Sequence, residues 1–121
     1  MSARFKAVRI DRELECPEID AGLRAAGCEL VLLPEGVGED ALCAAVRDSD
    51  LLLMCYTPVT ARVIESAAKL RGIVKYGVGI DAIDVAAAMA RGIPVLTEVA
   101  ALIPIYGIPA AVAWYLAYRH G

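Results

Sequence analysis

The sequence has few of the residues that enzymes often use for acid–base chemistry. Histidine occurs once, as His120, next to the last residue, and phenylalanine and tryptophan also occur once each. A general base must be held within hydrogen-bond reach of its substrate, whereas residues at a chain end are usually poorly held. His120 is therefore not a predicted catalytic residue.

The chain also lacks an excess of positive charge and closely spaced cysteines. Lys and Arg number 12 against 15 Asp and Glu, a net charge of -3, which argues against nucleic-acid binding. The four cysteines, Cys16, Cys28, Cys43 and Cys55, form no C-x-x-C pair and have no nearby histidine, so neither a zinc site nor a redox motif is indicated. Two disulfides are conceivable. Because most of these cysteines lie in apolar runs and no signal peptide is evident, we expect reduced thiols and a cytoplasmic protein.

Apolar residues are abundant. Hydrophobic residues make up 59% of the 121 residues, and the mean hydropathy is +0.57. These values are high for a soluble protein and predict either an unusually buried sheet or a surface that something covers. The length suits one domain with its own core, residues 1–121, but not the two domains of a complete dinucleotide-dependent enzyme.

Short apolar runs alternate with helical patterns, which is typical of βαβ units. We expect strands over residues 5–10, 28–33, 50–56, 72–75 and 93–96. We expect helices from residue 13 or 17 to 26, over 39–47, after a Thr60 cap with an apolar stripe at Val63, Ile64, Ala67 and Ala68, and over 85–91 after an Asp84 cap. Gly27 and Gly92 are the expected helix stops. The predicted fold is α/β, a flavodoxin-like doubly wound parallel five-stranded sheet of order 2-1-3-4-5, with ligands at the carboxyl ends of the strands.

A glycine-rich loop, Lys75-Tyr76-Gly77-Val78-Gly79-Ile80-Asp81, follows the fourth expected strand. Its glycines allow a ligand to approach the backbone, and consecutive amides in such a turn can bind an anion. Taken alone, the loop is more simply interpreted as a tight strand-to-helix connection. It is not a dinucleotide fingerprint, because Ala82 stands at the third glycine position and the loop does not follow the first strand.

Four blocks together carry more information than this loop. They are Tyr-Thr-Pro-Val-Thr at 56–60, Ala-Ala-Lys-Leu-Arg-Gly-Ile at 67–73, Tyr-Gly-Val-Gly-Ile-Asp-Ala-Ile-Asp at 76–84 and Ala-Arg-Gly-Ile-Pro-Val at 90–95. In this order and spacing they strongly resemble the D-isomer-specific 2-hydroxyacid dehydrogenase family, which includes phosphoglycerate, glycerate and formate dehydrogenases. The resemblance covers about residues 5–96.

The resemblance implies a substrate site in this chain. The amides of Val78 and Gly79, in the turn that begins at Gly77, would hold the carboxylate of a small 2-oxo or 2-hydroxy acid. Tyr56 and Thr57 would line the same cleft. Amides directed at an anion need no charged side chain, so the assignment is physically reasonable.

The neighbouring residues have less specific expected roles. We expect Asp81 to fasten the loop or cap the following helix rather than contact substrate. Tyr76 is either a pocket wall or a core residue. Lys75 alternates with apolar neighbours and is expected to be solvated or at the rim, although a basic group beside a carboxylate pocket remains an alternative.

The resemblance also implies what this chain does not supply. In the family, a second, Rossmann domain provides the nicotinamide of NAD or NADP, an arginine for the substrate carboxylate and a histidine–glutamate pair for the proton, and none of these has a match here. The first hypothesis is a substrate-binding domain that is inactive alone. The alternative is a subunit or fragment that is active only with a nucleotide-binding domain supplied in trans. A flavin-binding or receiver module ranks last, because the sequence lacks a hydroxyl-rich phosphate loop and an acidic cluster.

The segment 97–121 departs from the family pattern, of which only Pro104, Tyr106 and Gly107 match. It has no charged side chain from residue 99 to 118. Pro104, Gly107 and Pro109 interrupt any helix long enough to cross a bilayer, so a membrane span is not expected. We expect a short helix that packs on the domain's own sheet or on a second copy, giving a homodimer through residues 99–118. The wholesale replacement suggests an engineered, rearranged or truncated tail.

Overall fold

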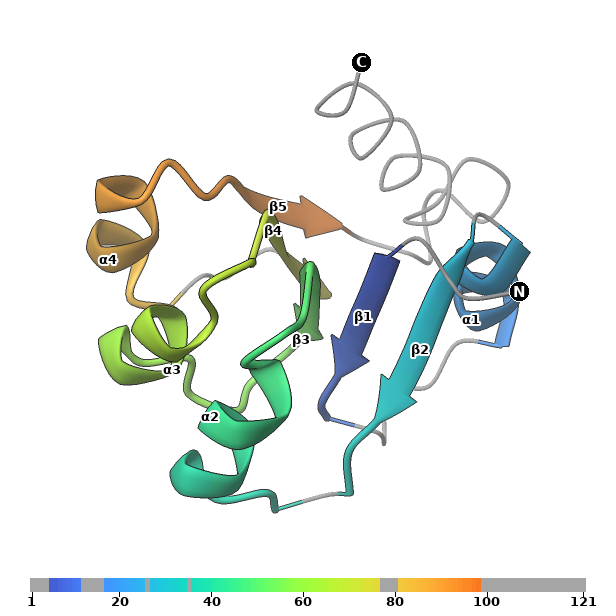
Figure 1. The fold of residues 1–121 in the computed structure, drawn as a ribbon, viewed down its shortest axis with the longest axis horizontal. Coiled ribbons are helices and arrows are strands. Elements are labelled where there is room, and N and C mark those ends of the chain that lie inside the picture. Colours follow the sequence, from blue (N-terminus) through green and yellow to red (C-terminus); the bar gives the residue numbers. More distant parts are fainter. Residues whose placement is uncertain (1–4, 12–16, 26, 35, 77–80, 99–121) are drawn as a thin grey trace.

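The computed structural model describes residues 5–11, 17–25, 27–34, 36–76 and 81–98. Strands and helices alternate along this part of the chain (Figure 1). The elements are β1 (Phe5–Arg9), α1 (Pro17–Ala25), β2 (Cys28–Leu32), α2 (Glu39–Val46), β3 (Leu51–Met54), α3 (Ala61–Ser66), β4 (Gly72–Tyr76), α4 (Val85–Ala90) and β5 (Val95–Glu98).

The strands form one sheet in the order β2-β1-β3-β4-β5, and every neighbouring pair is parallel. The predicted α/β class and the predicted order 2-1-3-4 of the first four strands are therefore confirmed. The four residues of β3 are all buried, as expected for an apolar strand between two neighbours and covered on both faces. At the edge, β5 pairs with β4 from Ile73 opposite Val95 to Tyr76 opposite Glu98.

Helices cover both faces of the sheet. Helices α2, α3 and α4 lie on one face and α1 on the other (Figure 1). The main core lies under the first group, where Val8 and Leu52 of the sheet pack with Leu42 of α2 and Ile64 of α3. Because side chains alternate along a strand, the residues between them, such as Ala7 and Leu53, face α1. Both faces of the sheet are thus apolar.

The helix ends follow the predicted chemistry. The Thr60 side chain accepts the Val63 N–H at 3.3 Å, and the Asp84 carboxylate accepts the Ala87 N–H at 3.0 Å. Gly27 (φ 94°) and Gly92 (φ 67°) occupy the left-handed region after α1 and α4, where a Cβ would be strained. These two caps and two helix stops are confirmed.

The predicted apolar stripe of the third helix is wrong at one position. Ala68 is exposed, because α3 ends at Ser66 and the chain turns away when the Ala67 N–H bonds to the Ile64 carbonyl oxygen at 3.1 Å. Ala67 itself remains fully buried. The stripe therefore stops one residue earlier than its spacing suggested.

Cys28 and Cys43 are buried free thiols. Among the described residues, none of the helices is both long and apolar enough to span a membrane. The predicted apolar tail lies outside the described residues from residue 99 onward.

Candidate functional site

Asp11, directly after β1, organises the carboxyl edge of the sheet. Its Oδ2 accepts the backbone N–H groups of Cys55 at 2.6 Å, Tyr56 at 2.9 Å and Thr57 at 3.1 Å, and its Oδ1 accepts the Thr57 hydroxyl. The side chain is buried, with 3% exposure. A carboxylate with several N–H donors is strongly solvated by the protein, so Asp11 holds the loop after β3 in one conformation.

The hydrogen bonds from residues 55–57 to the Asp11 carboxylate, which we call the Asp11 clamp, explain why the third strand is shorter than predicted. Residues 55 and 56 were expected in the strand, but β3 ends at Met54 and the chain bends from Cys55 to Thr57. Amides that donate to a carboxylate cannot also continue a strand ladder. Asp11 itself adopts φ 64°, a left-handed conformation that Asp tolerates better than most side chains.

Sequence reasoning missed Asp11. The available signal was an aspartate at the end of the first predicted strand, next to a loop already expected to matter for ligands. A single aspartate in a turn is too common to single out, and its partners lie 44 to 46 residues further along the chain.

Backbone hydrogen bonds also join the loops that follow β3 and β4. The Val59 N–H bonds to the Ala82 carbonyl oxygen at 2.8 Å, and the Asp84 N–H bonds to the Val59 carbonyl oxygen at 2.9 Å. Val59 and Ile83 form a parallel bridge, and both are buried. The two loops are therefore held side by side above neighbouring strands.

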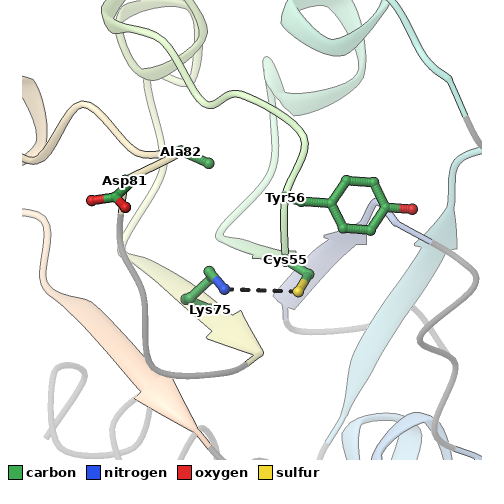
Figure 2. Close-up of a pocket in the computed structure, with 5 residues that line it drawn as sticks. All are labelled: Cys55, Tyr56, Lys75, Asp81 and Ala82. Carbon is green, nitrogen blue, oxygen red and sulfur yellow. Dashed lines mark hydrogen bonds between the residues drawn. The ribbon is translucent and has the colours of Figure 1, made fainter.

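A pocket of about 210 Å³ lies between these loops (Figure 2). Its lining residues are Cys55, Tyr56, Lys75, Asp81 and Ala82. They come from the loop after β3, from β4 and from the loop after β4, which places the pocket at the carboxyl edge of the sheet. Ligand sites of doubly wound sheets lie at this edge.

Lys75 is the main correction to the predicted site. It was expected to be solvated or at the rim, yet it is buried, with 9% exposure. It pairs with Met54 on β3 and Thr97 on β5, and it shares a face with Ile73, two residues earlier, which belongs to the core. A central strand covered on that face leaves little room for solvent, and the Lys75 ammonium group lies 3.7 Å from the Cys55 sulfur (Figure 2).

The structure places only part of the predicted substrate site. Tyr56 lines the pocket, with 46% of its surface exposed, and its ring points away from Lys75 (Figure 2). Thr57 bonds to Asp11 through both its amide and its hydroxyl. The amides of Tyr56 and Thr57 are therefore engaged within the protein. Gly77, Val78 and Gly79 lie outside the described residues, and so does the side chain of Tyr76.

Asp81 is exposed and lines the pocket, while Asp84 supplies the cap of α4. Within the part of the chain that the structure describes, there is no cluster of three or more His, Cys, Asp or Glu residues that could bind a metal. The chemistry that these residues offer is the binding of a small anion by an ammonium group, with a thiol beside it.

Residues 8–102 match the catalytic domain of the D-isomer specific 2-hydroxyacid dehydrogenases, and the chain belongs to this family. The chain is similar to the D-3-phosphoglycerate dehydrogenase of Mycobacterium bovis, with 44% identity over 63 residues that make up 51% of this chain and 12% of that protein.

Solved structures of the same kind share the fold. A 3-phosphoglycerate dehydrogenase of Entamoeba histolytica with bound NAD⁺ superimposes with a TM-score of 0.73 and 24% identity, over 81% of this chain and 33% of that chain. An NAD-dependent formate dehydrogenase of Staphylococcus aureus in complex with NAD gives a TM-score of 0.63 and 28% identity, over 77% of this chain and 32% of that chain. This chain thus corresponds to a minor part of each relative.

Proposed function

We propose that this chain is the substrate-binding domain of an NAD- or NADP-dependent D-2-hydroxyacid dehydrogenase. It binds the carboxylate of a small 2-oxo or 2-hydroxy acid and is inactive without a nucleotide-binding domain. Membership in the family supports this function. The observation that carries it is the buried Lys75 in a pocket at the carboxyl edge of the sheet.

A charge-assisted hydrogen bond between an ammonium group and a carboxylate is stronger than one between neutral groups. A small acid in this pocket, whose volume is about 210 Å³, can form such a bond with Lys75. Under this proposal Lys75 attracts the carboxylate, and the amides of Val78 and Gly79, in the turn that begins at Gly77, complete the anion site. The Tyr56 and Thr57 segment, fixed by Asp11, forms the opposite wall.

The residues of this chain do not fit a dinucleotide. A nucleotide-binding sheet carries glycines directly after its first strand, where the pyrophosphate approaches the backbone. Here the stretch from Ile10 to Ala21 contains no glycine, and Asp11 places a carboxylate at the end of β1. Under this proposal a second domain holds the nicotinamide and provides the proton donor.

The finer features of the fold are part of the same proposal. We take the domain to be a flavodoxin-like five-stranded unit that occupies residues 1–121 of a cytoplasmic protein. Its apolar tail, residues 99–118, covers a hydrophobic surface of this domain or of a second copy. Sedimentation of the full chain beside a variant with charged residues in this segment tests the homodimer.

Titration with glyoxylate, followed by backbone amide shifts, tests the proposed function. We expect shifts concentrated at residues 55–57, 75–79 and 81–82, and small changes at the amino edge of the sheet. In Lys75→Met the affinity falls about tenfold or more, because a partly buried charge-assisted bond is lost. A neutral amide analogue of glyoxylate is the matched ligand control and binds weakly to both proteins.

Two outcomes would contradict the proposal. One is a folded wild-type chain whose pocket amides do not shift at millimolar glyoxylate. The other is equal affinity for the acid and for its neutral analogue. Addition of a separately produced nucleotide-binding domain with NADH then asks whether the bound acid is reduced in trans.

A further inference from the structure

The pocket contains two nucleophilic side chains in contact. The Lys75 Nζ lies 3.7 Å from the Cys55 Sγ, and the two side chains point toward one another from β4 and from the loop after β3 (Figure 2). Lys75 is opposite Met54, the residue before Cys55, so the pairing of β3 with β4 determines this proximity. The Asp11 clamp fixes the Cys55 backbone through a 2.6 Å hydrogen bond.

Cys55 differs from the other described cysteines. Cys28 and Cys43 are buried in the core, with 5% and 7% exposure. Burial, and secondarily the charge of Asp50, raise the pKa of the Cys28 thiol, which disfavours its reactive thiolate. Cys55 is partly exposed, lines a pocket open to small solutes, and has a cation beside it. Exposure and a neighbouring positive charge are the features that make a cysteine susceptible to oxidation.

We propose that Cys55 and Lys75 form an oxidation site at which a peroxide produces a reversible cysteine–lysine cross-link. The reaction starts from the thiolate form of Cys55 beside the Lys75 ammonium group, because the thiolate is the nucleophile. The Cys55 thiolate attacks one oxygen of hydrogen peroxide, so that an S–O bond forms and the O–O bond breaks. The leaving hydroxide takes a proton from the Lys75 ammonium group and becomes water. Sulfur is oxidised by two electrons to a sulfenic acid, and the peroxide is reduced.

The second step needs no further oxidant. Lys75, now a neutral amine, attacks the sulfenic acid sulfur; an S–N bond forms, the S–O bond breaks, and water leaves. Condensation of a sulfenic acid with nitrogen is known chemistry for cysteine. A small thiol reverses the link: it displaces the amine to give a mixed disulfide, and a second thiol then releases Cys55.

The cross-link removes the positive charge of Lys75 and joins two walls of the pocket. If the proposed function holds, acid binding is lost in the cross-linked protein and returns on reduction. The cross-link itself requires only the geometry of the two side chains, so it is tested without the acid.

The experiment treats the full chain with hydrogen peroxide, with and without dimedone to trap sulfenic acid, and maps peptides by mass spectrometry. We expect Cys55 to react about tenfold faster than Cys28 and Cys43. The product is a linked peptide pair containing residues 55 and 75. Its mass is the sum of the Cys55 sulfenic acid peptide and the Lys75 peptide, less one water. Dithiothreitol restores both side chains.

Two variants separate the steps. Cys55→Ser gives no link at residue 75. Lys75→Arg keeps a positive charge beside the sulfur, but its guanidinium stays protonated and does not condense, so the trapped sulfenic acid increases. Circular dichroism verifies that both variants fold. Should Lys75→Arg fail to fold, the wild-type chain still tests whether the cross-link forms. An amine reagent applied after denaturation fails to label Lys75 only if the link has formed.

Peroxide-treated wild type in which Lys75 remains fully labelled, or in which Cys28 or Cys43 reacts before Cys55, would overturn the proposal. Glyoxylate binding before and after oxidation is a separate measurement. A link without any acid binding to the reduced protein refutes the proposed function alone, whereas acid binding without a link refutes only this inference.

Discussion

The strands of the parallel sheet begin at one edge, the amino edge, and end at the other, the carboxyl edge. Each of these two edges contains a buried aspartate that accepts one or more backbone N–H groups. At the amino edge, Asp50 precedes β3, accepts the Lys6 N–H at 2.9 Å and lies 3.6 Å from the Arg71 Nε. At the carboxyl edge, Asp11 accepts three amides and a hydroxyl from the loop after β3. In the part of the chain that the structure describes, a pocket with a buried lysine and a thiol lies beside Asp11.

The comparison shows that similar chemistry serves different purposes at the two edges. At the amino edge, opposite charges neutralise one another, and backbone bonds of 2.8 Å tie Asp50 to Lys6 and Arg71. At the carboxyl edge, the carboxylate is used to shape a loop, while the cation lies in a pocket next to it. The contacts at the amino edge therefore contribute to stability, whereas the carboxyl edge is where we propose that the acid binds.

The largest expected effect comes from Asp11→Ala. It leaves three amides and a hydroxyl without their acceptor and puts alanine at a positive φ, so the free energy of unfolding should fall by roughly 3 kcal/mol. Urea denaturation measures this change. Asp11→Asn is the matched control, because asparagine tolerates the left-handed conformation and keeps one acceptor oxygen; it should lose less. Equal stability of all three proteins would show that the clamp contributes nothing.

Asp50→Ala tests the opposite edge. Loss of the acceptor for the Lys6 N–H and of the charge near Arg71 should lower the free energy of unfolding by about 2 kcal/mol. Asp50→Asn, which can still accept the N–H, should lose about half as much. Glyoxylate affinity should not change in either variant. A loss of affinity as large as that of Lys75→Met would remove the functional distinction between the two edges.

Thr57→Val isolates one bond of the clamp. The Thr57 hydroxyl donates to the Asp11 carboxylate, and valine has the same shape without a donor. We expect the free energy of unfolding to fall by about 1.5 kcal/mol, the usual contribution of a hydrogen bond to a charged group. Thr57→Ser retains the hydroxyl and should stay close to wild type in urea denaturation. If Ser and Val behave alike, the hydroxyl is not the cause.

Asp48→Asn gives the smallest effect, at the exposed rim of the amino edge. The hydrogen bond from the Lys6 ammonium group, 2.7 Å away, lowers the pKa of the Asp48 carboxyl from its ordinary value of 3.8. A carboxyl with a depressed folded pKa stabilises the protein above its unfolded pKa and loses that contribution as pH falls through the folded value. Wild type should therefore slightly exceed Asp48→Asn near neutral pH, with the difference vanishing well below 3.8. High salt should reduce it too, because exposed pairs are screened.

Much of the fold could be predicted because it depends on local patterns. Alternating apolar runs identified the strands, and the caps at Thr60 and Asp84 and the stops at Gly27 and Gly92 follow from the chemistry of helix ends. The four blocks of family resemblance indicated the carboxyl edge as the place of the site. The match over residues 8–102 confirms the family, while the position of the site stays a prediction.

The composition of the pocket could not be predicted in the same way. Whether Lys75 meets solvent depends on which strands flank β4 and what covers that face, and neither is encoded near residue 75. The role of Asp11 depends on amides 44 to 46 residues away. By itself, the sequence determined the elements and their succession along the chain, because backbone propensity and periodicity act over a few residues. The family followed from the resemblance of the four sequence blocks. Only the tertiary structure decided which charges are buried and which groups meet, because burial and electrostatics act between residues that folding brings together.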